Sequence, residues 1–99
     1  MFEEVYKACL QYQLLKDNLA VAAEVEIPVV YDNVKLDIGY RADLIVQKSL
    51  IIELKAVQNI TPLHKAQLLT YLKLSSLKTG LLLNFNTPQL KEGITRIVN

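Results

Sequence analysis

The stretch LIIELKAV, residues 50–57, is apolar along its whole length apart from one glutamate and one lysine. Alternation along an extended chain places Ile51, Glu53 and Lys55 on one face and Ile52 and Leu54 on the other. A strand that is apolar on both faces is normally buried, and ionised groups there are costly unless they are paired or bind a metal. We therefore expect residues 50–57 to form a central strand that carries a charged site.

The extended run before this strand, residues 34–46, is joined to it by only three residues. If the two runs pair antiparallel with Val46 opposite Leu50, Asp43 lies opposite Glu53 on the same face. Directly opposed Cβ atoms are about 5 Å apart, so the two carboxylates repel each other unless a cation lies between them. Mg²⁺ takes oxygen ligands of this kind. A slip of one residue in the register would place the two acids on opposite faces.

The same register places Arg41 opposite Lys55. Beside a metal ion, Lys55 would orient or deprotonate an attacking water. The alternative is a plain ion-pair network, in which Lys55 and Arg41 neutralise Asp43 and Glu53. The strand pattern alone favours neither interpretation.

Periodicity and turn residues predict the other elements. Residues 2–17 form a helix whose buried stripe would consist of Phe2, Val5, Tyr6, Cys9, Leu10, Gln13 and Leu14. Thr61 is the expected N-cap of a second helix, with Pro62 in its first position. The predicted elements are a helix over 2–17, strands over 21–31, 34–46 and 50–57, a helix from 61 to about 76, a strand over 81–85 and an edge strand over 95–98. This order predicts an α/β fold, a mixed central β-sheet flanked by helices.

Composition limits the class of protein. The 99 residues suit one domain, and 52% apolar with 21% charged residues is ordinary for a globular protein. The chain has no membrane span or secretory signal, so we expect a cytoplasmic protein without a membrane partner. Cys9 is the only cysteine of the sequence, and His64 is the only histidine. These counts exclude an internal disulfide framework and a multi-cysteine metal site.

Charge is unevenly distributed along the chain. The net charge is only +1, but residues 41–78 carry six lysines and arginines against two acids. This block would form a basic face for a polyanion, or its lysines simply solvate a surface. Glu24 and Glu26 lie in the acidic N-terminal part, and we expect them to form a solvated strand face.

The second helix carries an unusual stripe: His64, Gln67, Leu68 and Tyr71 recur at helical spacing. By itself this pattern also suits the edge of an amphipathic helix. Together, Asp43, Glu53-Leu54-Lys55 and the Gln67-to-Tyr71 Q-x-x-x-Y pattern resemble the PD-(D/E)XK nuclease superfamily and its RecB-like branch.

Several blocks are similar to the GxxExxY family within that superfamily. They are Tyr40-Arg41-Ala42-Asp43-Leu44, Ile52-Glu53-Leu54-Lys55-Ala56, Thr61-Pro62-Leu63-His64, Ala66-Gln67-Leu68-Leu69-x-Tyr71-Leu72 and Leu83-Asn84-Phe85. Glu3 and Tyr6 match the E-x-x-Y part of the motif, but its leading glycine would precede Met1. The resemblance thus implies one nuclease-like domain over residues 1–99, restriction-endonuclease-like in fold and truncated at its N-terminus.

The resemblance also implies roles for individual residues. The metal, Mg²⁺ or Mn²⁺, would be held by Asp43, Glu53, the Leu54 carbonyl and Glu3. Lys55 would position the water or stabilise charge on the phosphate, and Gln67 would orient the groups of the site. Substrate phosphate would be contacted by Tyr71, His64 and Arg41, with His64 alternatively capping the site.

Three functional classes follow from these patterns. The leading hypothesis is a Mg²⁺-dependent phosphodiesterase that acts on nucleic acid, either DNA or RNA. The alternative is a non-catalytic nucleic-acid- or protein-binding module on a nuclease scaffold, acting with a partner or as a homo-oligomer. A purely structural assembly protein would leave the buried acids and lysine unexplained. The chain has no phosphate-binding glycine loop, G-x-S-x-G elbow or H-E-x-x-H motif.

Overall fold

The computed structural model describes residues 2–99, with every side chain in that range except those of Phe2 and Ile38. Five strands form one sheet in the order β1-β2-β3-β4-β5. Only β3 and β4 run parallel, and the other neighbours are antiparallel. The elements are α1 (Phe2–Lys16), β1 (Val21–Tyr31), β2 (Val34–Val46), β3 (Leu50–Lys55), α2 (Pro62–Ser75), β4 (Thr79–Asn84), the short 3₁₀ helix η1 (Leu90–Gly93) and β5 (Ile94–Val98). The predicted α/β class and element order are confirmed, whereas η1 was not predicted.

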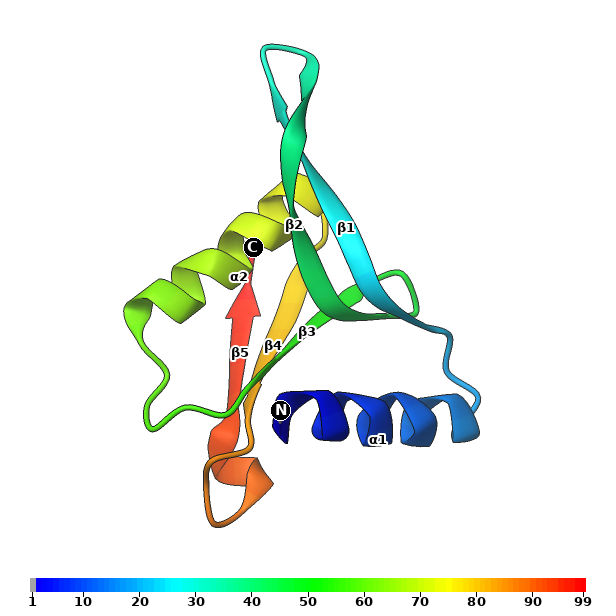
Figure 1. Ribbon diagram of the computed structural model, residues 1–99, viewed down its shortest axis with the longest axis vertical. Coiled ribbons are helices and arrows are strands. Elements are labelled where there is room, and N and C mark those ends of the chain that lie inside the picture. The colour runs from blue at the N-terminus through cyan, green and yellow to red at the C-terminus, as the bar shows by residue number, and fades with distance from the viewer. Residues whose placement is uncertain (1) are drawn as a thin grey trace.

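The sheet lies between the two helices, and β3 is buried on both of its faces (Figure 1). Ile51 of β3 packs in a cluster with Leu68 and Leu72 of α2. Ile52 and Leu54 belong to the opposite cluster, against which Leu10 and Leu14 of α1 pack. The two-faced apolar pattern of residues 50–57 thus has the predicted cause: one helix covers each face of the strand.

Helix α2 connects the parallel strands β3 and β4, and both of its ends are defined by side chains or backbone geometry. The Thr61 hydroxyl accepts the N–H of His64 at 3.3 Å, and His64 Nδ1 accepts the N–H of Thr61 at 3.0 Å. This reciprocal capping box satisfies two donors that a helix start would otherwise leave free. Ser76 ends the helix with a left-handed φ of 60°. A Cβ on Gly80 of β4 would lie 2.9 Å from the Leu68 side chain, so glycine allows α2 to pack closely on the sheet.

Helix α1 covers the opposite face less completely. Leu10 and Leu14 pack against the sheet, and Lys7 is buried beside them. Val5, Tyr6, Cys9 and Gln13 are exposed, which corrects the predicted buried stripe, and the Phe2 side chain lies outside the described part of the chain. The helix is apolar on two sides, and the side that docks is the one that also brings Lys7 to Glu24. The pattern alone could not distinguish the two sides.

The β1–β2 hairpin is longer than the rest of the sheet and extends beyond it, at the top of Figure 1. Its turn is the predicted Asp32-Asn33, with φ of 53° and 63°. Val30, Tyr31 and Val34 near the tip are exposed. No helix of residues 2–99 is long and apolar enough to cross a membrane.

Candidate metal-binding active site

The site lies where β2 and β3 stop pairing with each other. Val46 lies opposite Leu50, which confirms the predicted register, and the regular ladder ends at the pair Leu44–Ile52. The next residues are Asp43 and Glu53. The Asp43 N–H donates to Glu53 Oε1 at 2.9 Å, and the Leu54 N–H donates to Asp43 Oδ2 at 2.8 Å. Each acid therefore replaces a carbonyl as the hydrogen-bond acceptor, and the two carboxylates are held close together.

Burial makes this pair electrostatically strained. Glu53 is only 8% exposed, and burial, followed by the charge of Asp43, raises its pKa from 4.5 to about 7. The charge of Glu3 raises the pKa of Glu53 further, while the Asp43 N–H and the charge of Lys55 lower it. Without a cation the pair therefore favours holding a proton near neutral pH.

The pair is not part of the ion-pair network that the alternative interpretation predicts. Within residues 2–99, the ion pairs are Lys7–Glu4, Lys7–Glu24 and Arg41–Glu24, and none includes Asp43 or Glu53. Arg41 does not pair with Lys55, because the β2–β3 ladder has ended before it. The two carboxylates thus have amide donors but no ion-paired cation among the described side chains.

The donor set fits a hard divalent ion. Every buried side-chain oxygen and nitrogen in the described part of the chain has a hydrogen-bond partner. Oδ1 of Asp43 and Oε2 of Glu53, which make no such bond, are therefore reachable by solvent. Because N–H and C=O of one residue point to the same side of a strand, the Leu54 carbonyl points toward Asp43, as its N–H does. Mg²⁺ commonly takes one or two carboxylates and completes its shell with water or phosphate.

Glu3 reaches this end of β3 from the first turn of α1. Its Oε1 accepts the Ala56 N–H at 3.2 Å. Tyr6, one turn later, stacks on Phe85 with ring centroids 4.2 Å apart, which holds the start of α1 over the ends of β3 and β4. Among the described side chains, no three acids, histidines or cysteines gather closely enough to hold an ion by themselves. Glu3 thus lies near the pair while bonding to the strand backbone.

Helix α2 brings Tyr71 to the acids. Tyr71 is buried, and its pKa is raised by burial and then by the charges of Glu53 and Asp43. The Tyr40 ring packs 5.2 Å from the Tyr71 ring. Gln67, one turn earlier on α2, is exposed, and His64, at the start of the helix, uses its Nδ1 in the capping box.

The matching family model is described as that of the PD-(D/E)XK nuclease superfamily, and it matches residues 1–97. The chain belongs to this superfamily. Its fold is also similar to the crystal structure of SSO0001, with 26% sequence identity and a TM-score of 0.74. That alignment covers 99% of this chain and 50% of the other, so the chain spans about half the length of SSO0001. No curated protein matches the chain significantly.

Within this superfamily fold, Glu24 has a backbone conformation and ion-pair partners that the sequence did not predict. The β1–β2 register is unchanged on both sides of Glu24 and Asp43, yet these two opposed residues leave the ladder, and Glu24 has a φ of 54°. Its carboxylate binds Lys7 from α1 and Arg41 from β2. Glu24 and Glu26 are exposed, as predicted, but Glu24 is also ion-paired next to the acid pair, which was not predicted.

A polar hollow of about 520 Å³ borders Asp43, and its lining consists of Glu26, Asp37, Gly39, Tyr40, Arg41 and Asp43. It gives Asp43 an open approach on the hairpin side. An apolar hollow of about 430 Å³ lies elsewhere, near Val21, Ile45 and Leu77, and does not include either acid.

Asn84 was predicted only as part of a motif, and in the structure it positions the chain that follows β3. It is buried at the end of β4, opposite Lys55. Its amide accepts the N–H of Val57 at 3.1 Å and donates to the Val57 carbonyl at 2.8 Å. These bonds fix the chain directly after the E-x-K segment. A buried asparagine that ends an apolar strand was the available signal.

Proposed function

We propose that the chain is a divalent-metal-dependent nuclease that hydrolyses phosphodiester bonds in nucleic acid. The observation that carries the proposal is the Asp43–Glu53 pair, two carboxylates held together by backbone amides with no ion-paired cation among the described residues. Such an arrangement is costly as a structural element. It is useful where a metal ion binds, and membership of the nuclease superfamily points to the same chemistry.

In this proposal Asp43, Glu53 and the Leu54 carbonyl hold Mg²⁺ or Mn²⁺. When bound, the ion neutralises charge on the phosphate and activates a water. The half-buried Lys55 lies on the same strand face as Glu53 and stabilises negative charge that develops on the phosphate. Glu3 would complete the metal shell from the first turn of α1, where its Oε1 accepts the Ala56 N–H.

The remaining predicted residues bind or orient the substrate. Tyr71 presents its hydroxyl to the acid pair and contacts a phosphate oxygen there, and Gln67 orients the groups beside it. Arg41 contacts the nucleic-acid backbone from the rim of the polar hollow, where its side chain is 69% exposed. His64 keeps its Nε2 for a phosphate contact while its Nδ1 caps the helix.

We also assign the chain to the GxxExxY branch of the superfamily. Glu3 and Tyr6 supply its E-x-x-Y pattern, and both side chains contact the end of the sheet that carries Glu53 and Lys55. The motif spacing therefore has a purpose in this fold, because it docks the start of α1 at the proposed site.

Calorimetric titration of Mn²⁺ tests the metal site without any assumption about substrate. We expect binding by the native chain and by Lys55→Ala, and no binding by Asp43→Ala. Asp37→Ala is the matched control, because Asp37 is an exposed acid of β2 that borders the same hollow. A folded native chain that does not bind Mn²⁺ would overturn the proposal.

Cleavage assays then test catalysis on single- and double-stranded DNA and RNA. We expect Mn²⁺-dependent cleavage of at least one of the four by the native chain, and none by Asp43→Ala or Lys55→Ala. Metal binding without cleavage of any of them would favour the non-catalytic binding module instead.

A further inference from the structure

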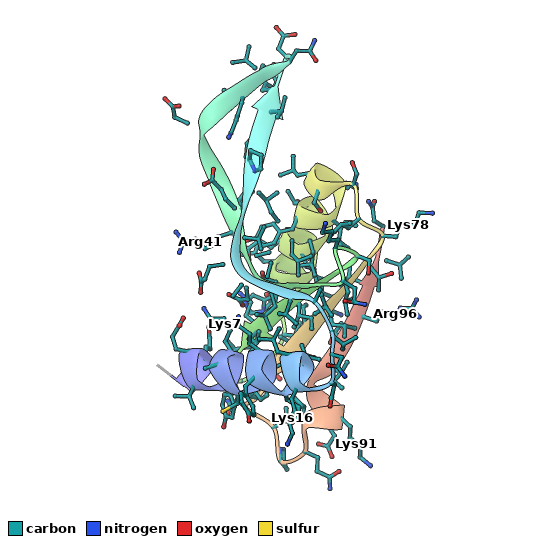
Figure 2. The ribbon with its side chains drawn as sticks, turned by 90° about the vertical axis from the view of Figure 1, so that its right-hand side faces the viewer. Lys7, Lys16, Arg41, Lys78, Lys91 and Arg96 are labelled. Atoms are coloured by element: carbon teal, nitrogen blue, oxygen red, sulfur yellow. The ribbon has the colours of Figure 1, made fainter. Side chains whose placement is uncertain are left out.

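Helix α1 has a second apolar face whose side chains are largely exposed among the described residues. Leu10, Leu14 and Lys7 face the sheet. On the opposite side, Val5 is 58%, Tyr12 67% and Leu15 49% exposed, and Ala8 is exposed between them. Figure 2 shows Lys7 and Lys16 leaving α1 on opposite sides.

The spacing of these outer residues is regular. Val5, Ala8, Tyr12 and Leu15 follow one another at intervals of three, four and three residues. This is the a/d spacing of two heptads, which forms a narrow seam along a helix and is typical of contact with one other helix. A helix that is apolar on two opposite sides is normally covered on both.

We propose that the outer face of α1 binds the same face of a second copy of this chain, with the two helices antiparallel. In antiparallel pairs an a position packs against a d position of the other helix. A two-fold axis beside residue 10 then places Val5 against the partner's Leu15, and Ala8 against the partner's Tyr12. The smallest side chain of the seam thus meets the largest, so both layers are filled without a void or an overlap.

The charges of α1 favour the antiparallel direction. The first turn carries Glu3 and Glu4, and the last turn carries Lys16. Antiparallel pairing brings the acidic start of each helix to the basic end of the other, and it also opposes the two helix dipoles. A parallel pair would align like charges and would place Tyr12 against the partner's Tyr12.

The proposed dimer also acts on the candidate site. From the inner side of the same helix, Glu3 reaches the end of β3 and Lys7 reaches Glu24 of β1, while the outer side would be held by the partner. The acid pair itself lies between β2 and β3 and stays open. Pairing of α1 therefore fixes the position of Glu3 without covering Asp43 or Glu53.

Sedimentation equilibrium over a wide range of protein concentration tests the dimer. A contact one short helix long is at the small end of specific interfaces, so we expect a dissociation constant of about 1–100 µM. Tyr12→Glu should raise this constant by at least about 100-fold, because it places a charge in the seam. Tyr31→Glu is the matched control. Tyr31 is 74% exposed at the hairpin tip, and its replacement should leave the dissociation constant unchanged.

Crosslinking through Cys9, the sole cysteine, tests the direction of the pair. Cys9 is exposed beside the seam, and antiparallel pairing places it near its own copy. A short bis-maleimide should therefore yield a covalent dimer of the native chain and of Tyr31→Glu, and none of Tyr12→Glu or Cys9→Ser. Circular dichroism of each variant shows that it is folded.

Three results would overturn the proposal. The first is a native chain that stays monomeric at several hundred µM, and the second is a dimer lost in Tyr31→Glu but kept in Tyr12→Glu. A dimer that needs Tyr12 but does not crosslink through Cys9 would exclude the antiparallel arrangement.

Discussion

Strand β3 has two very different neighbours. Toward β4 it pairs along all six residues, from Leu50 to Lys55. Toward β2 it pairs only at Leu50, Ile51 and Ile52, and the next amides bond to carboxylates. The β4 side of the strand thus holds the fold together, whereas the β2 side gives up regular pairing to bring two acids together.

The energetic consequence differs between the two sides. On the β4 side, Asn84 adds hydrogen bonds where the ladder ends, so each polar group there supports the folded chain. On the β2 side, burial and repulsion raise the pKa of Glu53. Neutralising Glu53 on the β2 side should therefore stabilise the metal-free chain at neutral pH, whereas removing the Asn84 amide on the β4 side should destabilise it.

Asp43→Asn should have the largest effect on the proposed activity. Asparagine keeps an oxygen for the Leu54 N–H but removes the negative charge that attracts the metal. If the substitution removes several kcal/mol of the transition-state stabilisation that the metal supplies, the rate should fall at least about 1,000-fold. Initial rates of Mn²⁺-dependent cleavage, with the best of the four nucleic acids, measure it. Activity within tenfold of native would show that the β2 side is not the catalytic one.

The stability of the metal-free chain should fall as pH rises from about 4.5 to about 7. The folded chain holds a proton on Glu53 over this window, since its pKa is raised to about 7, whereas the unfolded chain has released it. Each pKa unit corresponds to about 1.4 kcal/mol, so the loss reaches about 3 kcal/mol.

Denaturant unfolding of the native chain and Glu53→Gln, each at pH 5 and pH 8, isolates this contribution. At pH 8, Glu53→Gln should be more stable than the native chain. The substitution should also remove most of the difference in unfolding free energy between pH 5 and pH 8. Added Mn²⁺ should stabilise only the native chain at pH 8. A Glu53→Gln variant that is less stable than native at pH 8 would contradict the assignment of strain to this side.

Asn84→Ala should destabilise the chain by about 2–3 kcal/mol, because it removes three hydrogen bonds and leaves Val57 without partners. Thermal unfolding measures the loss. Asn84→Asp keeps the acceptor for the Val57 N–H but not the donor to the Val57 carbonyl, so its loss of stability should be intermediate. An Asn84→Ala variant as stable as the native chain would mean that the β4 side contributes less to stability than its hydrogen bonds suggest.

Arg41→Gln should have the smallest effect on stability. Its ion pair with Glu24 is largely exposed and spans 3.2 Å, and exposed pairs contribute at most about 1 kcal/mol. Urea unfolding at low and high salt checks this value. A loss above about 2 kcal/mol would show that Arg41 supports the acid pair through Glu24.

Local patterns predicted the fold well where sequence neighbours decide the structure. The three-residue connection determined the β2–β3 register, and Thr61-Pro62 marked the start of α2. The docking side of α1 was not predictable, because the helix is apolar on two sides and only the sheet selects between them. The ion pairs of Glu24 were not predicted for a related reason: its partners Lys7 and Arg41 each lie 17 residues away, one before it and one after it. No local periodicity contains that information.

The order of the sheet leaves β1 and β5 as its open edges, and each is unsuited to further strand addition. In β1, Pro28 has no N–H to offer, the register shifts between Pro28 and Val30, and Glu24 has a left-handed backbone. Strand β5 is only five residues long and carries an exposed Arg96. Short, charged or irregular edges of this kind resist aggregation through strand pairing. Concentrated solutions of the chain should therefore stay free of fibrils even where molecules associate through their helices.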